Sequence, residues 1–156
     1  MKFLLDQALG GLCKWLRILG YDAISLREDP ETILKKAQEE GRIIVTRTRG
    51  LFEKIKGKGQ VYFIRENKPL FQLKELFGNL DLKVREETLF SRCLLCNQEL
   101  REVSPDEVKD RVPDFIFRTH THFSECPKCH RVFWGGTHYE RMIKTLREVF
   151  GEDNWG

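Results

Sequence analysis

Short apolar runs alternate with segments of helical periodicity along the first half of the chain. Four runs are rich in Val, Ile, Leu, Phe and Tyr, as in strands that are buried on both faces of a sheet. These runs are residues 2–6, 21–26, 42–46 and 60–64. The segments that follow them place apolar side chains three and four residues apart, the spacing of an amphipathic helix. These segments are residues 7–20, 30–41, 51–55 and 69–78. The alternation predicts an α/β fold with a small parallel sheet flanked by helices.

Residues typical of helix ends mark several of these segments. Gly20 is expected to follow the first helix as its C′ residue, and Asp29 is expected to cap the second helix, with Pro30 at the first helical position. Near the C-terminus, Thr137 and Glu140 stand in capping-box register at the start of a last helix. The apolar stripe of that helix indicates that it docks on another part of the protein.

The strand and helix patterns weaken after residue 80, where the paired cysteines begin to dominate. We therefore expect an α/β domain over residues 1–80 and a linker with a cysteine module over residues 81–136. The remaining residues, 137–156, are expected to form the C-terminal helix that docks on the rest.

Four of the five cysteines form two Cys-x-x-Cys pairs, Cys93 with Cys96 and Cys126 with Cys129. In a reducing compartment such pairs are metal ligands more often than disulfides. Each pair makes a tight turn that presents two sulfurs to one point, so the two pairs predict a tetrahedral zinc site. Four thiolates leave no open coordination position, and the ion is therefore expected to be structural. The fifth cysteine, Cys13, lies in an apolar helical pattern and is expected to be a small buried side chain.

The stretch "CPKCH" at residues 126–130 also matches the haem-attachment motif. That motif requires export to an oxidising compartment, whereas the N-terminus "MKFLLDQALGG" has no signal-peptide pattern, and haem would leave the first cysteine pair unexplained. We therefore expect zinc and no haem. No apolar run approaches the roughly 20 residues of a membrane span, so we expect a cytoplasmic protein without a membrane partner.

Charge is distributed unevenly along the 156 residues, although the formal net charge is only +3. Residues 42–68 hold eight Lys or Arg against two Glu, and residues 115–147 are also basic, whereas residues 81–114 are acidic on balance. Two basic regions favour a surface that binds a polyanion, and ordinary solvated faces would explain the charge equally well. The chain carries no signal for an oligomeric state.

The carboxyl ends of parallel strands meet at one edge of a sheet, which should bring Asp6, the residues after Leu26 and the stretch Thr46–Arg49 together. Asp6 directly ends an apolar strand and is the first candidate ligand for Mg²⁺ or Mn²⁺, although it could equally cap the following helix. Further carboxylates and cations near this edge are Asp22, Glu28, Asp29, Glu31, Lys14, Arg17, Arg47 and Arg49. A divalent metal there could activate water against a phosphodiester, and the cations could contact its phosphate.

Three stretches together resemble a known family. They are "FLLDQALGGLCKWLRILGYDA", "AQEEGRIIVTRTR", and the cysteine pairs followed by "RVFWGGTHYERM". In this order they are similar to the Mut-seven C-terminal ribonuclease domain family, in which a PIN-like domain is joined to a C-terminal zinc ribbon.

The resemblance implies an acidic cluster that binds a divalent metal and hydrolyses RNA. Asp6 matches the acid of the first strand, and the region Asp29–Glu31 matches the place of a second acid. The family's third acid follows a Thr-Arg pair after the third strand, where this chain has Thr48 after Thr46 and Arg47. A threonine leaves the cluster one negative charge short, and the nearby arginines lower metal affinity further.

Two interpretations follow from this missing acid. In the first, Asp22, Glu28 or Glu53 fills the gap and the ribonuclease remains active. In the second, the protein binds RNA or the ribosome without cutting RNA, through stacking and phosphate contacts of the cysteine module. The residues expected to make those contacts are Phe115, Phe117, Arg118, Phe123, Arg131 and Trp134.

His120 and His122 lie two residues apart and would share one face if "FRTHTHF" formed a strand. They could then bind a second metal or stack on bases, and they could equally be exposed polar residues of a half-buried strand.

Overall fold

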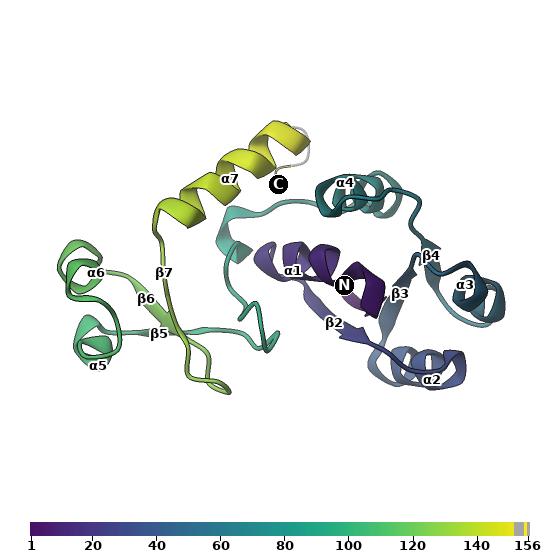
Figure 1. Cartoon of the computed structure of the whole chain (residues 1–156), viewed down its shortest axis with the longest axis horizontal. Coiled ribbons are helices and arrows are strands. Elements are labelled where there is room, and N and C mark those ends of the chain that lie inside the picture. Colours follow the sequence, from purple (N-terminus) through teal and green to yellow (C-terminus); the bar gives the residue numbers. More distant parts are fainter. Residues whose placement is uncertain (152–154, 156) are drawn as a thin grey trace.

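Four parallel strands in the order β2-β1-β3-β4 form the main sheet of the molecule, seen in the computed structural model of Figure 1. The structure describes residues 1–151 and 155. The strands are β1 (Lys2–Asp6), β2 (Asp22–Leu26), β3 (Arg42–Thr46) and β4 (Val61–Phe63). Side chains of the central strands alternate between two apolar layers, with Phe3 and Val45 on one side and Leu4 and Ile44 on the other. This arrangement confirms the predicted α/β fold class.

Helices cover both faces of this sheet, and together with the strands they form the sheet lobe. They are α1 (Gly10–Ile18), α2 (Pro30–Glu40), α3 (Arg49–Ile55) and α4 (Pro69–Leu80). Helices α1 and α4 pack on the layer that contains Phe3, and α2 and α3 pack on the layer that contains Leu4. The first helix differs from its predicted range, since a 3-10 turn over Gln7–Leu9 precedes α1. Asp6 caps that turn by accepting a hydrogen bond from the backbone N–H of Ala8.

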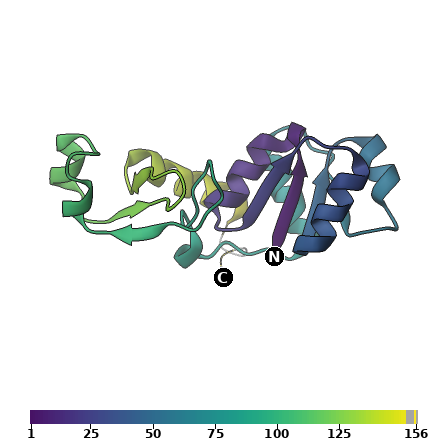
Figure 2. The same ribbon diagram turned by 90° about the horizontal axis from the view of Figure 1, so that it is seen from below.

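A second, antiparallel sheet lies at the other end of the molecule, in the order β5-β6-β7 (Figures 1 and 2). We call it, with its two short helices and the two Cys-x-x-Cys turns, the cysteine lobe. Its elements are β5 (Arg101–Val103), α5 (Pro105–Val108), α6 (Asp114–Thr119), β6 (Phe123–Glu125) and β7 (Val132–Trp134). A small apolar core of Val103, Val108, Val112 and Phe123 holds these elements together.

One condition and one prediction for the C-terminal half are not met. The stretch "FRTHTHF" does not form a strand that would place His120 and His122 on one face, because residues 114–119 form α6 and both histidines lie in the connection to β6. Thr137 and Glu140 form no capping box, since the N-cap of α7 (Thr137–Phe150) is Gly136, which has no side chain to accept a bond. The capping box of this half joins Ser104 and Glu107 at the start of α5.

Helix α7 runs from the cysteine lobe to the sheet lobe (Figures 1 and 2). Near its end, Phe150 stacks on Phe77 of α4 with ring centroids 4.5 Å apart, and Leu146 is fully buried in the core of the sheet lobe. Near its start, Tyr139 stacks on Phe90 at 4.0 Å. None of the helices in the described part of the chain is both long and apolar enough to cross a bilayer.

The first cysteine turn is hydrogen-bonded directly to the sheet lobe. The Arg17 guanidinium donates to the carbonyl oxygens of Ala23 and Leu94, both at 2.8 Å, and so joins α1, β2 and the turn. From the turn, the Asn97 side chain accepts from the backbone N–H of Ala23 at 3.0 Å and donates to the Asp22 carboxylate at 2.6 Å. We call these bonds the lobe latch.

Gly20 lies at the centre of the same junction. Its φ of +94° is in the left-handed region, and a Schellman motif ends α1 there, with Gly20 N–H bonded to Arg17 O and Tyr21 N–H bonded to Leu16 O. Its carbonyl accepts from Arg92, which lies beside the first cysteine. The position therefore requires a residue without a Cβ.

We expect Gly20→Ala to destabilise the protein by about 3 kcal/mol, because it adds left-handed strain and overpacking. A Cβ at Gly20 would lie 2.8 Å from the Cβ of Thr88 and would collide with the Thr88 carbonyl. Gly41→Ala is the matched control, since Gly41 also has positive φ but no atom within 4 Å of an added Cβ, and it should cost only about 1 kcal/mol. Urea unfolding of both variants measures the difference, and equal losses would contradict the proposed collision.

The Asp22 carboxylate should make the stability of the protein sensitive to acid. Burial alone would raise the pKa of Asp22, but hydrogen bonds from Arg42 and Asn97 outweigh burial and hold this pKa below its ordinary value. Because the pKa of Asp22 is lower in the folded state, its carboxylate stabilises the protein above about pH 4. This contribution to the free energy of unfolding is lost as the pH falls through the folded-state pKa.

We therefore expect Asp22→Asn to lose about 2 kcal/mol at pH 7 and to lose less additional stability than the wild type between pH 5 and pH 2. Chemical unfolding across this pH range measures the effect. Asp110→Asn, which changes an exposed carboxylate, should follow the wild-type pH profile. Parallel pH profiles of Asp22→Asn and the wild type would argue against this role.

Candidate functional site

Asp6 is buried at the carboxyl end of β1, with 7% of its surface exposed. Its Oδ1 accepts from Ala8 N–H at 2.9 Å, and its Oδ2 accepts from Arg47 N–H at 2.9 Å and from the Thr46 hydroxyl. The Thr48 hydroxyl lies 3.4 Å from the same Oδ2. The carboxylate thus anchors β1 to the turn between β3 and α3. Of its two oxygens, Oδ1 accepts fewer hydrogen bonds than Oδ2.

A cavity of about 420 Å³ opens beside Asp6 at this edge of the sheet. Its lining includes two carboxylates, Asp6 and Glu28, and two cations, Arg27 and Lys54, and Thr48 also lines it. The formal charges balance, whereas dedicated divalent-cation sites are rich in carboxylates. The cavity therefore offers oxygen ligands for a cation together with positive groups for a phosphate.

Asp29, Asp22 and Glu53 are not among the described residues that line this cavity, although Asp29 stands between two that do, Glu28 and Pro30. Asp29 caps α2, where the N–H of Thr32 donates to its carboxylate at 2.8 Å and lowers the pKa of Asp29. Asp22 is the first residue of β2 and lies at the amino ends of the parallel strands, whereas Asp6 lies at their carboxyl ends. The Asp22 carboxylate pairs with Arg42 at 2.7 Å. Glu53 pairs with Lys56 at 2.6 Å. Of the three replacement acids considered, Glu28 is the one that lines the cavity.

The predicted phosphate-binding cations also have other neighbours. Arg17 belongs to the lobe latch, Arg47 donates to the side chain of Asn67, and Arg49 lies 4.8 Å from the ring centroid of Phe63. Lys14 lines a separate cavity of about 620 Å³ between α1 and the cysteine lobe. The structure therefore does not gather these four cations around Asp6.

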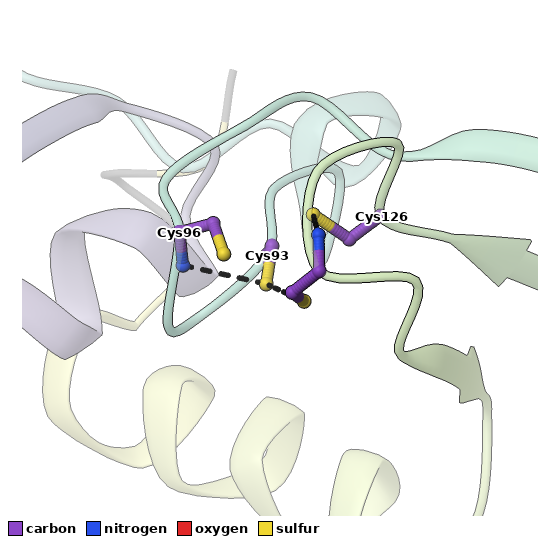
Figure 3. A group of neighbouring side chains, drawn as sticks. Cys93, Cys96 and Cys126 are labelled. Atoms are coloured by element: carbon purple, nitrogen blue, oxygen red, sulfur yellow. Dashed lines mark hydrogen bonds between the residues drawn. The ribbon is translucent and has the colours of Figure 1, made fainter.

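The four paired cysteines converge on one point in the cysteine lobe (Figure 3). All four sulfurs lie within 4.8 Å of one another, and the Sγ atoms of Cys93 and Cys129 are 3.7 Å apart. A metal ion held at about 2.3 Å by four tetrahedral sulfurs would separate them by about 3.8 Å. The cluster is thus able to hold a metal ion with a closed shell of ligands.

The two cysteine turns have the same backbone geometry. The residues after the second cysteines, Asn97 and His130, adopt left-handed φ values of 65° and 64°. Their N–H groups bond back to the carbonyls of Cys93 and Cys126, both at 2.9 Å. Asparagine and histidine are among the residues that tolerate this conformation best. His130, which the sequence left without a role, is therefore explained as a turn residue.

Backbone N–H groups point at the sulfurs within these turns. Cys96 N–H donates to the sulfur of Cys93 and Cys129 N–H to that of Cys126, both at 3.4 Å. The backbone N–H of Arg131 lowers the pKa of the Cys129 thiol to about 6. Burial has the opposite effect on the first pair, since it raises the pKa of the Cys93 thiol and raises that of Cys96 to about 12. The Cys129 thiol is therefore the one held toward the thiolate form that binds metals.

Three of the aromatic side chains predicted to contact RNA belong to the core of the cysteine lobe or pack against it. Phe123 is 1% exposed and offers no free ring, whereas Phe117 and Trp134 are half-buried against this core. Arg118 and Arg131 are exposed. Thr46, which the sequence placed beside Asp6 without a role of its own, is fully buried and donates to Asp6. Its signal was a hydroxyl at the end of the apolar run "RIIVT", beside the strand that ends in Asp6.

Comparison with known proteins gives two matches. The family model described as the Mut7-C RNAse domain matches residues 1–146. "Exonuclease mut-7 homolog" of Homo sapiens is 34% identical over 111 residues, which cover 67% of this chain and 13% of that protein. The chain therefore corresponds to a small part of the length of this relative. No solved structure matches this chain. The extent of the family match, across the sheet lobe and all four clustered cysteines, shows that the chain belongs to the Mut7-C RNAse domain family.

Proposed function

We propose that this protein is a PIN-like ribonuclease that hydrolyses RNA with Mg²⁺ or Mn²⁺ at the Asp6 cavity. One observation carries the proposal: in a chain of an RNase domain family, a strand-end carboxylate opens into a cavity with a second acid and two cations. RNA as the substrate, the metal and the catalytic role of Asp6 are parts of the proposal.

The oxygen atoms of the cavity fit a hard divalent cation. Asp6 Oδ1, the Glu28 carboxylate and the Thr48 hydroxyl are the groups that would hold the ion. Bound there, the ion would supply a water molecule of lowered pKa and would stabilise negative charge on the phosphate. Lys54 and Arg27 would orient the RNA backbone.

The hydroxyl of Thr48 makes this site weaker than one with three acids. Thr48 contributes no charge and lies 3.4 Å from Asp6 Oδ2 as a hydrogen-bond partner. An aspartate there would place two carboxylates side by side, and a divalent ion would relieve their repulsion. We therefore infer low metal affinity and slow cleavage.

A second candidate function is RNA binding without cleavage. The observation that favours it is that Asp6 Oδ2 already accepts hydrogen bonds from the Thr46 hydroxyl and from the Arg47 backbone N–H. In addition, the charged side chains that line the cavity have no net charge. In this case the carboxylate serves only to connect β1 with β3 and to cap the 3-10 turn.

Cleavage of a mixed single-stranded RNA pool in Mn²⁺ separates these candidates. We expect slow cleavage by the wild type and a loss of at least about a hundredfold in Asp6→Asn, because a catalytic metal supplies several kcal/mol. Thr48→Asp should raise the rate about tenfold by restoring a charged ligand.

Asp6→Asn keeps a side-chain oxygen that can cap the 3-10 turn, and circular dichroism checks that it folds. Glu28→Gln should lower the rate, whereas Glu53→Gln, which changes an acid outside the cavity, should not. If the wild type and Thr48→Asp are both inactive yet shift RNA on a gel, the ribonuclease proposal is wrong and the binding function holds.

We also propose that the four-cysteine cluster binds one structural Zn²⁺. Tetrahedral thiolate sets select zinc, and the sulfur spacing of 3.7 Å matches its bond lengths. The ion would replace the large core that the cysteine lobe lacks.

Purified protein should contain one zinc per chain, measured by elemental analysis. We expect Cys126→Ser to lose the metal and to unfold the cysteine lobe, as seen by loss of antiparallel-sheet amide protection in hydrogen exchange. The control, Cys13→Ala, removes a buried thiol outside the cluster and should keep one zinc per chain. Full retention of zinc in Cys126→Ser would contradict the assignment.

A further inference from the structure

A groove of about 720 Å³ lies between the antiparallel sheet and the start of α7. Helix α6 and strands β6 and β7 line it, as do the Gly135–Gly136 turn and the first turn of α7. None of its lining residues belongs to the Asp6 cavity. The groove is therefore a separate feature that the proposed cleavage site does not use.

Aromatic side chains supply much of the lining. Phe115 is 66% exposed and is among the few large apolar side chains on the surface, and Phe133 and Trp134 line the groove from β7. Tyr139 and Phe90 line it as a stacked pair. These rings offer flat apolar surfaces of the kind on which nucleobases stack.

The polar lining and its surroundings suit a polyanion. His120, His122 and His138 line the groove, and among the described residues Glu140 is its single carboxylate. Residues 115–147 carry six Lys or Arg against two Glu. One of these acids, Glu125, is buried between Arg101 and Arg111, so it does not offset the surface charge.

Five cations of this segment have no acidic partner within the described part of the chain. They are Arg118, Lys128, Arg131, Arg141 and Lys144. Three of them, Arg118, Arg131 and Arg141, directly adjoin groove-lining residues in the chain. Positive groups beside stacking platforms are the arrangement by which proteins hold single-stranded nucleic acid.

We propose that this groove binds single-stranded RNA, with bases stacked on Phe115, Trp134 and the other rings and phosphates on the neighbouring cations. The inference rests on the proposed action of the protein on RNA and assigns a separate binding site for it. Leu94 and Phe133 also line the cavity that contains Lys14 and Arg17, so the groove continues onto the sheet lobe. RNA held in the groove would thus extend toward the lobe that carries Asp6.

Fluorescence anisotropy with a labelled 12-nucleotide single-stranded RNA tests this site, in buffer without added Mg²⁺ or Mn²⁺. We expect Phe115→Ala and His138→Ala each to weaken binding about fivefold or more, which corresponds to the lower limit of a base-stacking contact. Phe71→Ala is the matched control, because Phe71 is 52% exposed but lies on α4 outside the groove, and it should bind within twofold of the wild type. Trp134 is left unchanged because it packs on the core of the cysteine lobe.

Two competitors separate stacking from charge alone. A duplex RNA of the same sequence should compete at least about fivefold less well than the single strand, because its bases stack on one another. Poly-glutamate of equal charge should compete weakly. Binding by both groove variants at wild-type affinity, or equal competition by duplex or poly-glutamate, would overturn the proposal.

The cleavage assay distinguishes failure of this inference from failure of the proposed function. Cleavage that depends on Asp6, together with unaltered RNA binding by the groove variants, would refute the groove and leave the ribonuclease standing. RNA binding that the groove variants weaken, in a protein that cleaves no RNA, would refute the ribonuclease and leave the groove standing.

Discussion

The lobe latch is the interaction on which the arrangement of this protein depends. Asn97 ends the first cysteine turn in a left-handed conformation, and its side chain bonds at the same time to Ala23 and Asp22 of the edge strand β2. The turn that positions two metal-binding sulfurs is therefore also the turn that binds the parallel sheet. Binding an ion between the two cysteine turns would join the antiparallel sheet to the sheet lobe through this one segment.

The latch also gives an arginine of α1 a structural role. Arg17 donates to the Ala23 and Leu94 carbonyls, and a guanidinium with several fixed donors suits such a junction better than a flexible ammonium. Gly20 and Arg92 complete the same junction from the end of α1. A residue that resembles a phosphate ligand in the sequence is therefore a structural residue here.

Asp6 illustrates how one side chain can both connect parts of the fold and line a cavity. Its Oδ2 connects β1 to the β3–α3 turn, its Oδ1 caps the 3-10 turn, and the residue lines a cavity. The observed cap is therefore compatible with the site role that we propose for Asp6. Thr48 adds a hydroxyl and no charge to the cavity, whose two acids and two cations balance, and this neutrality is the basis of the weak metal binding that we propose.

The sequence by itself determined the α/β fold class, the strand boundaries of β1 and β3 and the pairing of the cysteines, because apolar periodicity and Cys-x-x-Cys spacing are local signals. It also identified Asp6 as the residue at the end of β1. Only the tertiary structure decided that Asp22 lies at the opposite end of the parallel strands from Asp6 and that Glu28 shares the cavity of Asp6. It also decided that Phe123 is a core residue rather than a surface residue. These outcomes depend on strand order and lobe packing, which join residues far apart in the chain and leave no periodic trace in the sequence.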